Sequence, residues 1–142
     1  MAKKETTTIT VQANINTPIE KVWKFWTEPK HIMKWNNASD DWHTPYAEND
    51  VRVGKKFLFR MAAKDGSVSF DFEGTYTNIK EHKVIEYSIM DGRKVKVTFS
   101  KEGKETKVVE TFEAENMNSI EMQKNGWEAI LNNFKKYVEE NN

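Results

Sequence analysis

The chain has 142 residues, enough for one domain and too few for two ordinary ones. It contains no cysteine, which excludes disulfide bonds, thiolate metal sites, iron–sulfur clusters and cysteine nucleophiles. Its 22 basic residues balance 22 acidic ones, so the basic excess typical of a nucleic-acid binder is missing.

The start of the chain, MAKKETTT, has two lysines but no apolar stretch behind them, so no secretory signal is predicted. No apolar run reaches the length of a membrane span. We therefore expect a soluble, cytoplasmic protein without membrane insertion.

The N-terminal part predicts a strand followed by two helices. Residues 6–14 alternate apolar and polar side chains and are rich in β-branched residues, which indicates a strand. The segment TPIE at residues 17–20 has the pattern of a capping box, with Pro18 at the first helical position. A second short helix is predicted at residues 30–35.

Residues 36–50 are predicted to form a long loop, and loops of this length often carry function. Within it, SDDWHTPYAEND holds four acids and His43, the inventory of a metal site or of an acid/base pair. The three histidines of the chain show no i, i+4 pair and no HExxH pattern. We therefore favour acids that shape the loop and a histidine that hydrogen-bonds locally, and we expect no metal and no cofactor.

From residue 51 onward the apolar residues recur with a period of two. Alternating runs cover residues 57–61, 68–76, 85–89 and 95–99, and a last strand is predicted to end at Phe112. Asp-Gly and Glu-Gly pairs mark turns between the later runs. This pattern predicts an antiparallel meander with one apolar and one polar face.

The C-terminal part predicts a long helix. Asn118 and Glu121 can form a capping pair, and a broad apolar stripe runs from Gln123 to Val138. Gly126 interrupts this helix at a cost of about 1 kcal/mol relative to alanine. We interpret it as a position where the sheet backbone, a tryptophan or a ligand approaches closely.

Together these elements predict a single α+β domain over residues 1–142. Its curved antiparallel sheet of six or seven strands wraps around the long C-terminal helix, and two short helices follow the first strand. A single helix leaves room inside such a sheet, and space lined by aromatic residues is a ligand pocket if side chains do not fill it.

The order of elements resembles one superfamily, as do four sequence segments: ITVQANINTPIEKVWKFWTEP, SDDWHTPYAENDVRVGKKFLFRM, DFEGTY and the closing helix with Gly126-Trp127. It is the START-like, helix-grip superfamily, also called SRPBCC, which includes the birch pollen allergen-like fold. Within it the chain is similar, over residues 8–140, to single-domain bacterial members. These are grouped with the C-terminal domain of the activator of the ninety-kilodalton heat-shock protein ATPase. The resemblance implies an apolar cavity between the sheet and the long helix.

The candidate cavity-lining residues belong to the predicted inner face, the long helix, and the loop with the helix before it: Trp35, Trp42, His43, Phe57, Phe59, Phe70, Phe72, Tyr76, Tyr87, Glu110, Gly126, Trp127, Ile130 and Phe134.

Two alternatives remain open among the candidate lining residues. Trp35, Trp42 and Tyr46 either wall the cavity mouth or form a satellite core under the loop. The hydroxyl groups of Tyr76 and Tyr87 either anchor the polar end of a ligand or reach the rim of the sheet.

Glu110 shares a face with apolar neighbours if the last strand alternates regularly, which would aim a carboxylate into the cavity. A β-bulge would instead turn Val109 and Thr111 inward.

The sequence predicts a binder of a small hydrophobic molecule, aromatic or lipid-like, with no assigned catalytic residue. One alternative is an enzyme of the polyketide cyclase or aromatase type, for which His43 and Glu110 are the candidate polar groups. Another is a co-chaperone-like module that stimulates a heat-shock protein ATPase, although no motif indicates a protein partner.

Overall fold

The computed structural model describes residues 7–141, which form seven strands and three helices. In chain order these elements are β1 (Thr8–Ile15), α1 (Ile19–Thr27), α2 (Pro29–Trp35), β2 (Trp42–Asn49), β3 (Lys56–Ala63), β4 (Ser69–Lys80), β5 (Val84–Ile89), β6 (Lys94–Glu102), β7 (Glu105–Glu113) and α3 (Ile120–Glu140). The predicted first strand began at Thr6, and that residue and the MAKKE segment lie outside the described residues.

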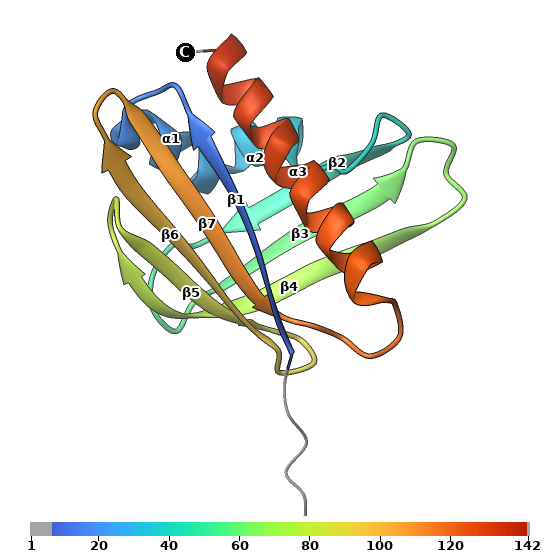
Figure 1. The fold of residues 1–142 in the computed structure, drawn as a ribbon. Helices are drawn as coiled ribbons and strands as arrows, with labels where there is room; N and C mark the ends of the chain where they lie inside the picture. The colour runs from blue at the N-terminus through green and yellow to red at the C-terminus, as the bar shows by residue number, and fades with distance from the viewer. Residues whose placement is uncertain (1–6, 142) are drawn as a thin grey trace, which may run out of the picture.

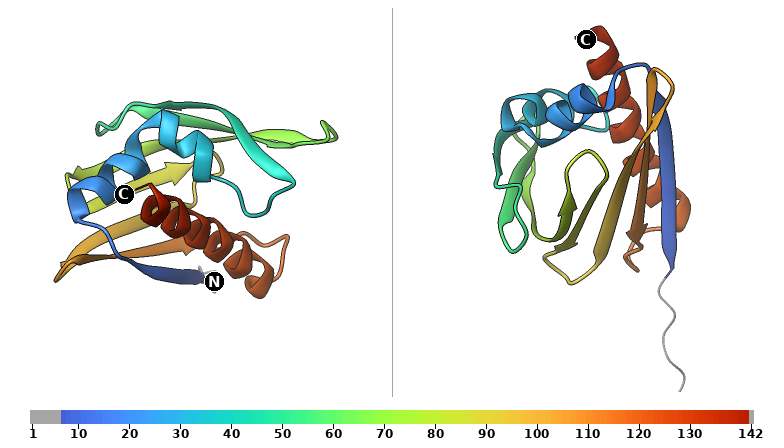
Figure 2. Two further views of the ribbon diagram at one scale, coloured as in Figure 1. Left: turned by 90° about the horizontal axis from the view of Figure 1, so that it is seen from above. Right: turned by 90° about the vertical axis from the view of Figure 1, so that its left-hand side faces the viewer.

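The strands form one antiparallel sheet in the order β1-β7-β6-β5-β4-β3-β2. The sheet curls strongly, and α3 runs diagonally across its concave side (Figure 1). The helices α1 and α2, which follow β1 and precede β2 in the chain, cover one end of the curled sheet (Figure 2). This arrangement confirms the predicted helix-grip fold, with seven strands. No helix within residues 7–141 is long and apolar enough to cross a bilayer.

Regular alternation in β7 determines which of its side chains face α3. Thr106, Val108, Glu110 and Phe112 are buried, while the residues between them are exposed or half-buried. The pairings of β7 with β1 and with β6 run without a register shift. The bulge that would have turned Val109 inward is therefore not there, and Glu110 lies on the concave face.

Gly74 in β4 makes room for an aromatic ring on the neighbouring strand. It pairs with Phe57 of β3, and a Cβ atom at Gly74 would lie 2.6 Å from two atoms of that ring and 2.9 Å from the carbonyl oxygen of Ser88. Because glycine has no side chain, the Phe57 ring can lie against the backbone of β4.

The predicted long loop over residues 36–50 is wrong, because most of it forms β2. This strand lies at the edge of the sheet, where an imperfect ladder is tolerated. Its Pro45 falls within a register shift between His43 and Tyr46, so the missing amide hydrogen breaks no regular pairing. The proline and the neighbouring acids are typical of a loop, so the sequence pattern did not predict this strand.

Both predicted capping boxes are also wrong. Thr17 donates its hydroxyl hydrogen to the preceding carbonyl oxygen at 2.7 Å, and no side chain caps α1. In α3 the cap is Ser119, whose Oγ accepts a hydrogen bond from the amide of Met122 at 3.1 Å. Asn118 instead donates through Nδ2 to the carboxylate of Glu115 at 2.5 Å.

Candidate ligand-binding cavity

A cavity of about 350 Å³ lies between the concave face of the sheet and α3. All of the helices and five strands contribute to its wall. The lining residues are Trp26, Trp35, Asn36, Asn49, Phe57, Phe59, Met61, Phe70, Phe72, Tyr76, Ile85, Tyr87, Arg93, Glu110, Glu115, Asn118, Gln123, Trp127 and Ile130. The wall is thus mainly aromatic, with a few polar groups at defined places.

Ring contacts hold the sheet side of the wall in place. The centroid of Phe57 lies 4.8 Å from that of Phe59 and 4.9 Å from that of Tyr87. On the helix side, Trp127 stacks on Phe112 at 3.9 Å with an angle of 13° between the rings. Such aromatic contacts add to the free energy of burial and restrict ring motion, so the wall is already formed in the free protein.

Trp35 is a fixed part of the wall. Its Nε1 donates to the carbonyl oxygen of Phe25 at 2.9 Å, and its own carbonyl oxygen accepts from Nδ2 of Asn133 at 2.7 Å. These bonds connect α2 to α1 on one side and to α3 on the other. Of the two interpretations of Trp35, a cavity wall is the one that its position matches.

Tyr76 is held by a short relay of hydrogen bonds at the end of the cavity under α1. Its hydroxyl donates to Oδ1 of Asn49, and Nδ2 of Asn49 donates to the carbonyl oxygen of Thr27 at 2.7 Å. Burial raises the pKa of the Tyr76 phenol, so it stays neutral and acts as a donor. This hydroxyl is already bonded within the protein.

Glu110 and Tyr87 differ from Tyr76 in having no such partner. Their residues are 5% and 8% exposed, and both line the cavity. Among the residues that the structure describes, neither the carboxyl group of Glu110 nor the hydroxyl of Tyr87 forms a hydrogen bond. No fully enclosed side-chain nitrogen or oxygen there lacks a partner, so both groups face the open space of the cavity. Burial raises the pKa of Glu110 to about 8, and burial together with the Glu110 charge raises the pKa of Tyr87 well above its ordinary value.

Polar residues gather where the cavity reaches the surface. Arg93 donates through Nε to Asp91 at 2.7 Å, and Gln123 donates through Nε2 to the carbonyl oxygen of Glu115 at 3.0 Å. Phe70 lines the same end of the cavity and is 52% exposed. We call Phe70, Arg93, Glu115 and Gln123 the mouth; they come from β4, the β5–β6 turn, the connection from β7 to α3, and α3 itself.

The structure brings ten of the fourteen predicted residues together around the cavity. They are Trp35, Phe57, Phe59, Phe70, Phe72, Tyr76, Tyr87, Glu110, Trp127 and Ile130. The aromatic members come from the predicted alternation on β3, β4 and β5, and the last two come from the apolar stripe of α3.

Trp42 and His43 do not line the cavity, because they belong to the edge strand β2 and not to a loop over its mouth. The ring of Trp42 lies 6.0 Å from that of Phe70, outside the wall. Tyr46 is exposed and lies under the guanidinium of Arg60 at 5.6 Å. The interpretation of Trp42 and Tyr46 as a wall of the cavity mouth is therefore wrong.

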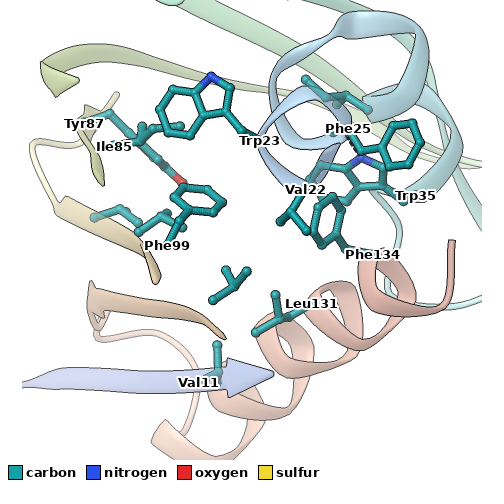
Figure 3. Close-up of a cluster of buried hydrophobic side chains, with 14 of the residues drawn as sticks. Val11, Val22, Trp23, Phe25, Trp35, Ile85, Tyr87, Phe99, Leu131 and Phe134 are labelled. Atoms are coloured by element: carbon teal, nitrogen blue, oxygen red, sulfur yellow. Dashed lines mark hydrogen bonds between the residues drawn. The ribbon is translucent and has the colours of Figure 1, made fainter. Parts of the chain in front are cut away.

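Phe134 is a core residue and not part of the wall. Its ring lies 4.8 Å from Trp26 and 4.7 Å from Trp35, and the side chain is fully buried. Figure 3 shows Phe134 reaching from α3 toward Trp35 and Val22. It supports the cavity from behind, through the two tryptophans.

Gly126 likewise does not line the cavity. A Cβ atom placed there would have no heavy atom within 4 Å outside the adjoining helix backbone and chain neighbours. The predicted close approach of sheet, tryptophan or ligand is therefore wrong.

The acidic segment before β2 shapes a turn. Ser39 donates its hydroxyl hydrogen to Asp41, whose carbonyl oxygen accepts from the amide of Lys64 at 2.8 Å. No three histidine or acidic side chains within residues 7–141 lie close enough to hold a metal ion. Since His43 is half-buried on β2 outside the cavity, an acid/base pair with Glu110 finds no support in the geometry.

Nine wall residues were missing from the candidates: Trp26, Asn36, Asn49, Met61, Ile85, Arg93, Glu115, Asn118 and Gln123. For four of them the sequence carried a signal. Met61 and Ile85 occupy the predicted inner faces of their strands, and Trp26 and Gln123 lie on the apolar stripes of their helices. The other residues lie in the connections between elements or, for Asn49, at the end of the irregularly paired strand β2, where apolar periodicity does not predict the direction of a side chain.

Comparison with known protein families matches residues 16–139 to the family described as "Activator of Hsp90 ATPase homolog 1-like protein". No curated protein matches the chain. Among solved structures, the AHSA1-like protein from Aeromonas hydrophila is 44% identical, with a TM-score of 0.90 over 95% of this chain and 94% of that one. A protein from Cytophaga hutchinsonii is 53% identical, with a TM-score of 0.81 over 94% and 92% of the two chains.

A third structure, from Nitrosomonas europaea, is 15% identical with a TM-score of 0.82 over 95% of this chain and 96% of that one, a likeness of fold alone. The family match covers most of the chain, and two relatives above 40% identity share its fold over nearly their whole length. The chain therefore belongs to the family of proteins like the Hsp90 ATPase activator homolog 1, with a START-like helix-grip fold.

Proposed function

We propose that the protein binds a small, largely apolar molecule in the cavity between the sheet and α3. The observation that carries this proposal is the aromatic cavity itself, whose volume of about 350 Å³ falls at the lower end of the range for small-molecule sites. Phe57, Phe59, Phe72 and Trp127 offer faces and edges to a flat ring system.

Several features of the wall support binding over simple packing. The rings are held by one another and by Trp35, so little conformational entropy is lost when a ligand enters. The mouth connects the cavity to solvent beside the half-exposed Phe70. The space is large enough for a bicyclic aromatic molecule, and most of its wall is apolar.

Filling the cavity tests this proposal. Ile130→Trp places an indole on the cavity side of α3, and Asn132→Trp adds the same group at an exposed position of the same helix. We expect naphthalene, titrated into the wild type and followed by NMR chemical shifts, to perturb the amides of wall residues. The Asn132→Trp protein should behave in the same way, and the Ile130→Trp protein should bind at least about tenfold more weakly, because the added ring occupies the site.

A naphthalene titration without shifts at wall residues would contradict the proposal, as would equal binding by the two tryptophan variants. The folded state of each variant is checked by its amide spectrum. Native mass spectrometry of protein isolated from cells is an independent measurement, in which a retained small molecule is expected.

A second candidate follows from the family description, which names an Hsp90 ATPase activator. Three exposed apolar side chains could meet a protein surface: Met117 in the connection before α3, and Ile120 and Met122 in the first turn of that helix. An Hsp90 ATPase rate that rises with added protein would support this function. A flat dose response would remove it without affecting the cavity proposal.

A further inference from the structure

We infer that the cavity recognises a ligand with a hydrogen-bond acceptor, a carbonyl or phenolic oxygen, through donors on Tyr87 and Glu110. This inference rests on the proposed binding function and specifies the chemical class of its ligand. Two polar side chains more than nine-tenths buried line an apolar cavity without any hydrogen-bond partner in the described chain. Because no fully enclosed side-chain nitrogen or oxygen in the described chain lacks a partner, the polar ends of both side chains face the open cavity, where a ligand can reach them.

The two groups come from neighbouring parts of the sheet wall. Glu110 lies on β7, opposite Val11 of β1 and Val97 of β6, so only apolar side chains flank it within the sheet. Tyr87 lies on β5, one strand beyond β6, and it interacts electrostatically with Glu110. Both side chains face the same cavity, so one bound ligand can contact both.

No described cation is placed to pair with Glu110. The titratable residues that share its cavity are Tyr76, Tyr87, Arg93 and Glu115. Arg93 is engaged at the mouth by Asp91 and by the carbonyl oxygen of Glu113, and the Tyr76 hydroxyl is bonded to Asn49. The side chains presented to the cavity by β3 and by all three helices carry no charge.

The protonation state decides which ligand chemistry fits. With its pKa raised to about 8 by burial, the carboxyl group of Glu110 keeps its proton at neutral pH and donates a hydrogen bond. The phenol of Tyr87 is neutral as well and donates. Two O–H donors in an apolar site match an oxygen acceptor, which stabilises the protonated acid further. A cationic ligand would instead require that Glu110 lose this proton.

A pair of probes of nearly equal shape isolates the acceptor. The ketone 2-acetylnaphthalene carries a carbonyl oxygen, and 2-isopropenylnaphthalene replaces that oxygen by a methylene group. We expect calorimetry at about pH 6.5 to show wild-type protein binding the ketone about tenfold or more tightly than the hydrocarbon, because a site built from buried donors discriminates against a partner that leaves them unpaired.

The variants assign this preference to the two side chains. Tyr87→Phe and Glu110→Leu are each expected to reduce the preference while the hydrocarbon still binds. Glu110→Gln keeps an N–H donor that does not titrate, so its preference is retained. In the wild type the preference is expected to fall as the pH rises through about 8, where Glu110 ionises and ceases to donate. In Glu110→Gln it is expected to stay constant.

Each result separates this inference from the proposed function. Failure of both probes to bind would overturn the binding function itself. Equal binding of the two probes by the wild type, or a preference unchanged in Tyr87→Phe and Glu110→Leu, would overturn the acceptor inference alone. Tight binding of 2-naphthylmethylammonium that requires Glu110 and strengthens toward pH 9 would assign the site to a cation and would also overturn it.

Discussion

Gly126 leads to a prediction at the scale of a single residue. It lies inside α3, where glycine costs up to about 1 kcal/mol relative to alanine. Outside the adjoining helix backbone and chain neighbours, no heavy atom lies within 4 Å of the position of an added methyl group. Gly126→Ala should therefore raise the free energy of unfolding in urea by about 0.5–1 kcal/mol. A loss of stability would show that the backbone at this position needs the freedom of glycine.

Glu110 shows how far a single position can be read from sequence. The alternation of β7 placed its side chain on the inner face, but the same pattern with one bulge would have turned it outward. The choice depends on unbroken pairing with β1 and β6, which is a property of three strands together. For Gly126 the residue type signalled a cost, yet only the surrounding atoms show that no close contact explains it.

At the scale of elements, the β3–β4 pair carries a matched prediction. Gly74→Ala is the same substitution as Gly126→Ala, but here the added methyl group meets the Phe57 ring and the Ser88 carbonyl oxygen. The ring must then shift into the cavity, where Phe59 and Tyr87 already contact it. We expect a loss of about 1–3 kcal/mol in the free energy of unfolding. Unchanged urea stability would mean that the ring moves freely.

The strand β2 marks the limit of element prediction. Apolar periodicity was enough to predict α1, α2 and α3, because the buried face of a helix is visible as a repeat of apolar residues in its own sequence. It failed for β2, whose pairing with β3 is interrupted around Pro45. An edge strand is defined by its neighbour, and its own residues can be those of a loop. Placing Trp42 and His43 at the cavity followed from that error.

At the scale of the whole molecule, burial of Glu110 predicts a pH-dependent stability. Its ordinary pKa of 4.5 rises to about 8 in the folded protein. Between these values the unfolded chain releases a proton that the folded protein keeps, so the free energy of unfolding falls as the pH rises through this window. The total change from this group is on the order of a few kcal/mol.

Glu110→Gln removes this contribution, because an amide does not titrate. Urea denaturation between about pH 5 and pH 8 should show a steeper decline for the wild type than for the variant. His31 acts with the opposite sign, since burial lowers its pKa and its contribution grows as the pH rises toward 6.5. It is common to both proteins and cancels in the difference. If the free energy of unfolding changed with pH in the same way in both proteins, Glu110 would have its ordinary pKa in the folded state.

The fold as a whole was predictable because the order of elements and their buried faces restrict the topology to few solutions. The volume of the cavity under α3 was not predictable from the sequence. Whether rings fill the space under α3 depends on how Trp35, Phe134 and Trp127 pack, and ångström-scale differences decide this. The polar wall residue Asn49 was missed for a similar reason, as its role arises from a bond to a backbone atom distant in the sequence.

The irregular pairing of β2 has a consequence for encounters between molecules. An edge strand presents unpaired amide and carbonyl groups, which are a template for joining the sheet of another chain. On β2, Pro45 removes one amide hydrogen from the strand, and the register shift beside it breaks the repeat that a second strand would have to match. The proline that made this strand hard to predict thus disfavours the pairing of this sheet edge with a strand of another molecule, which is a route to β-aggregation.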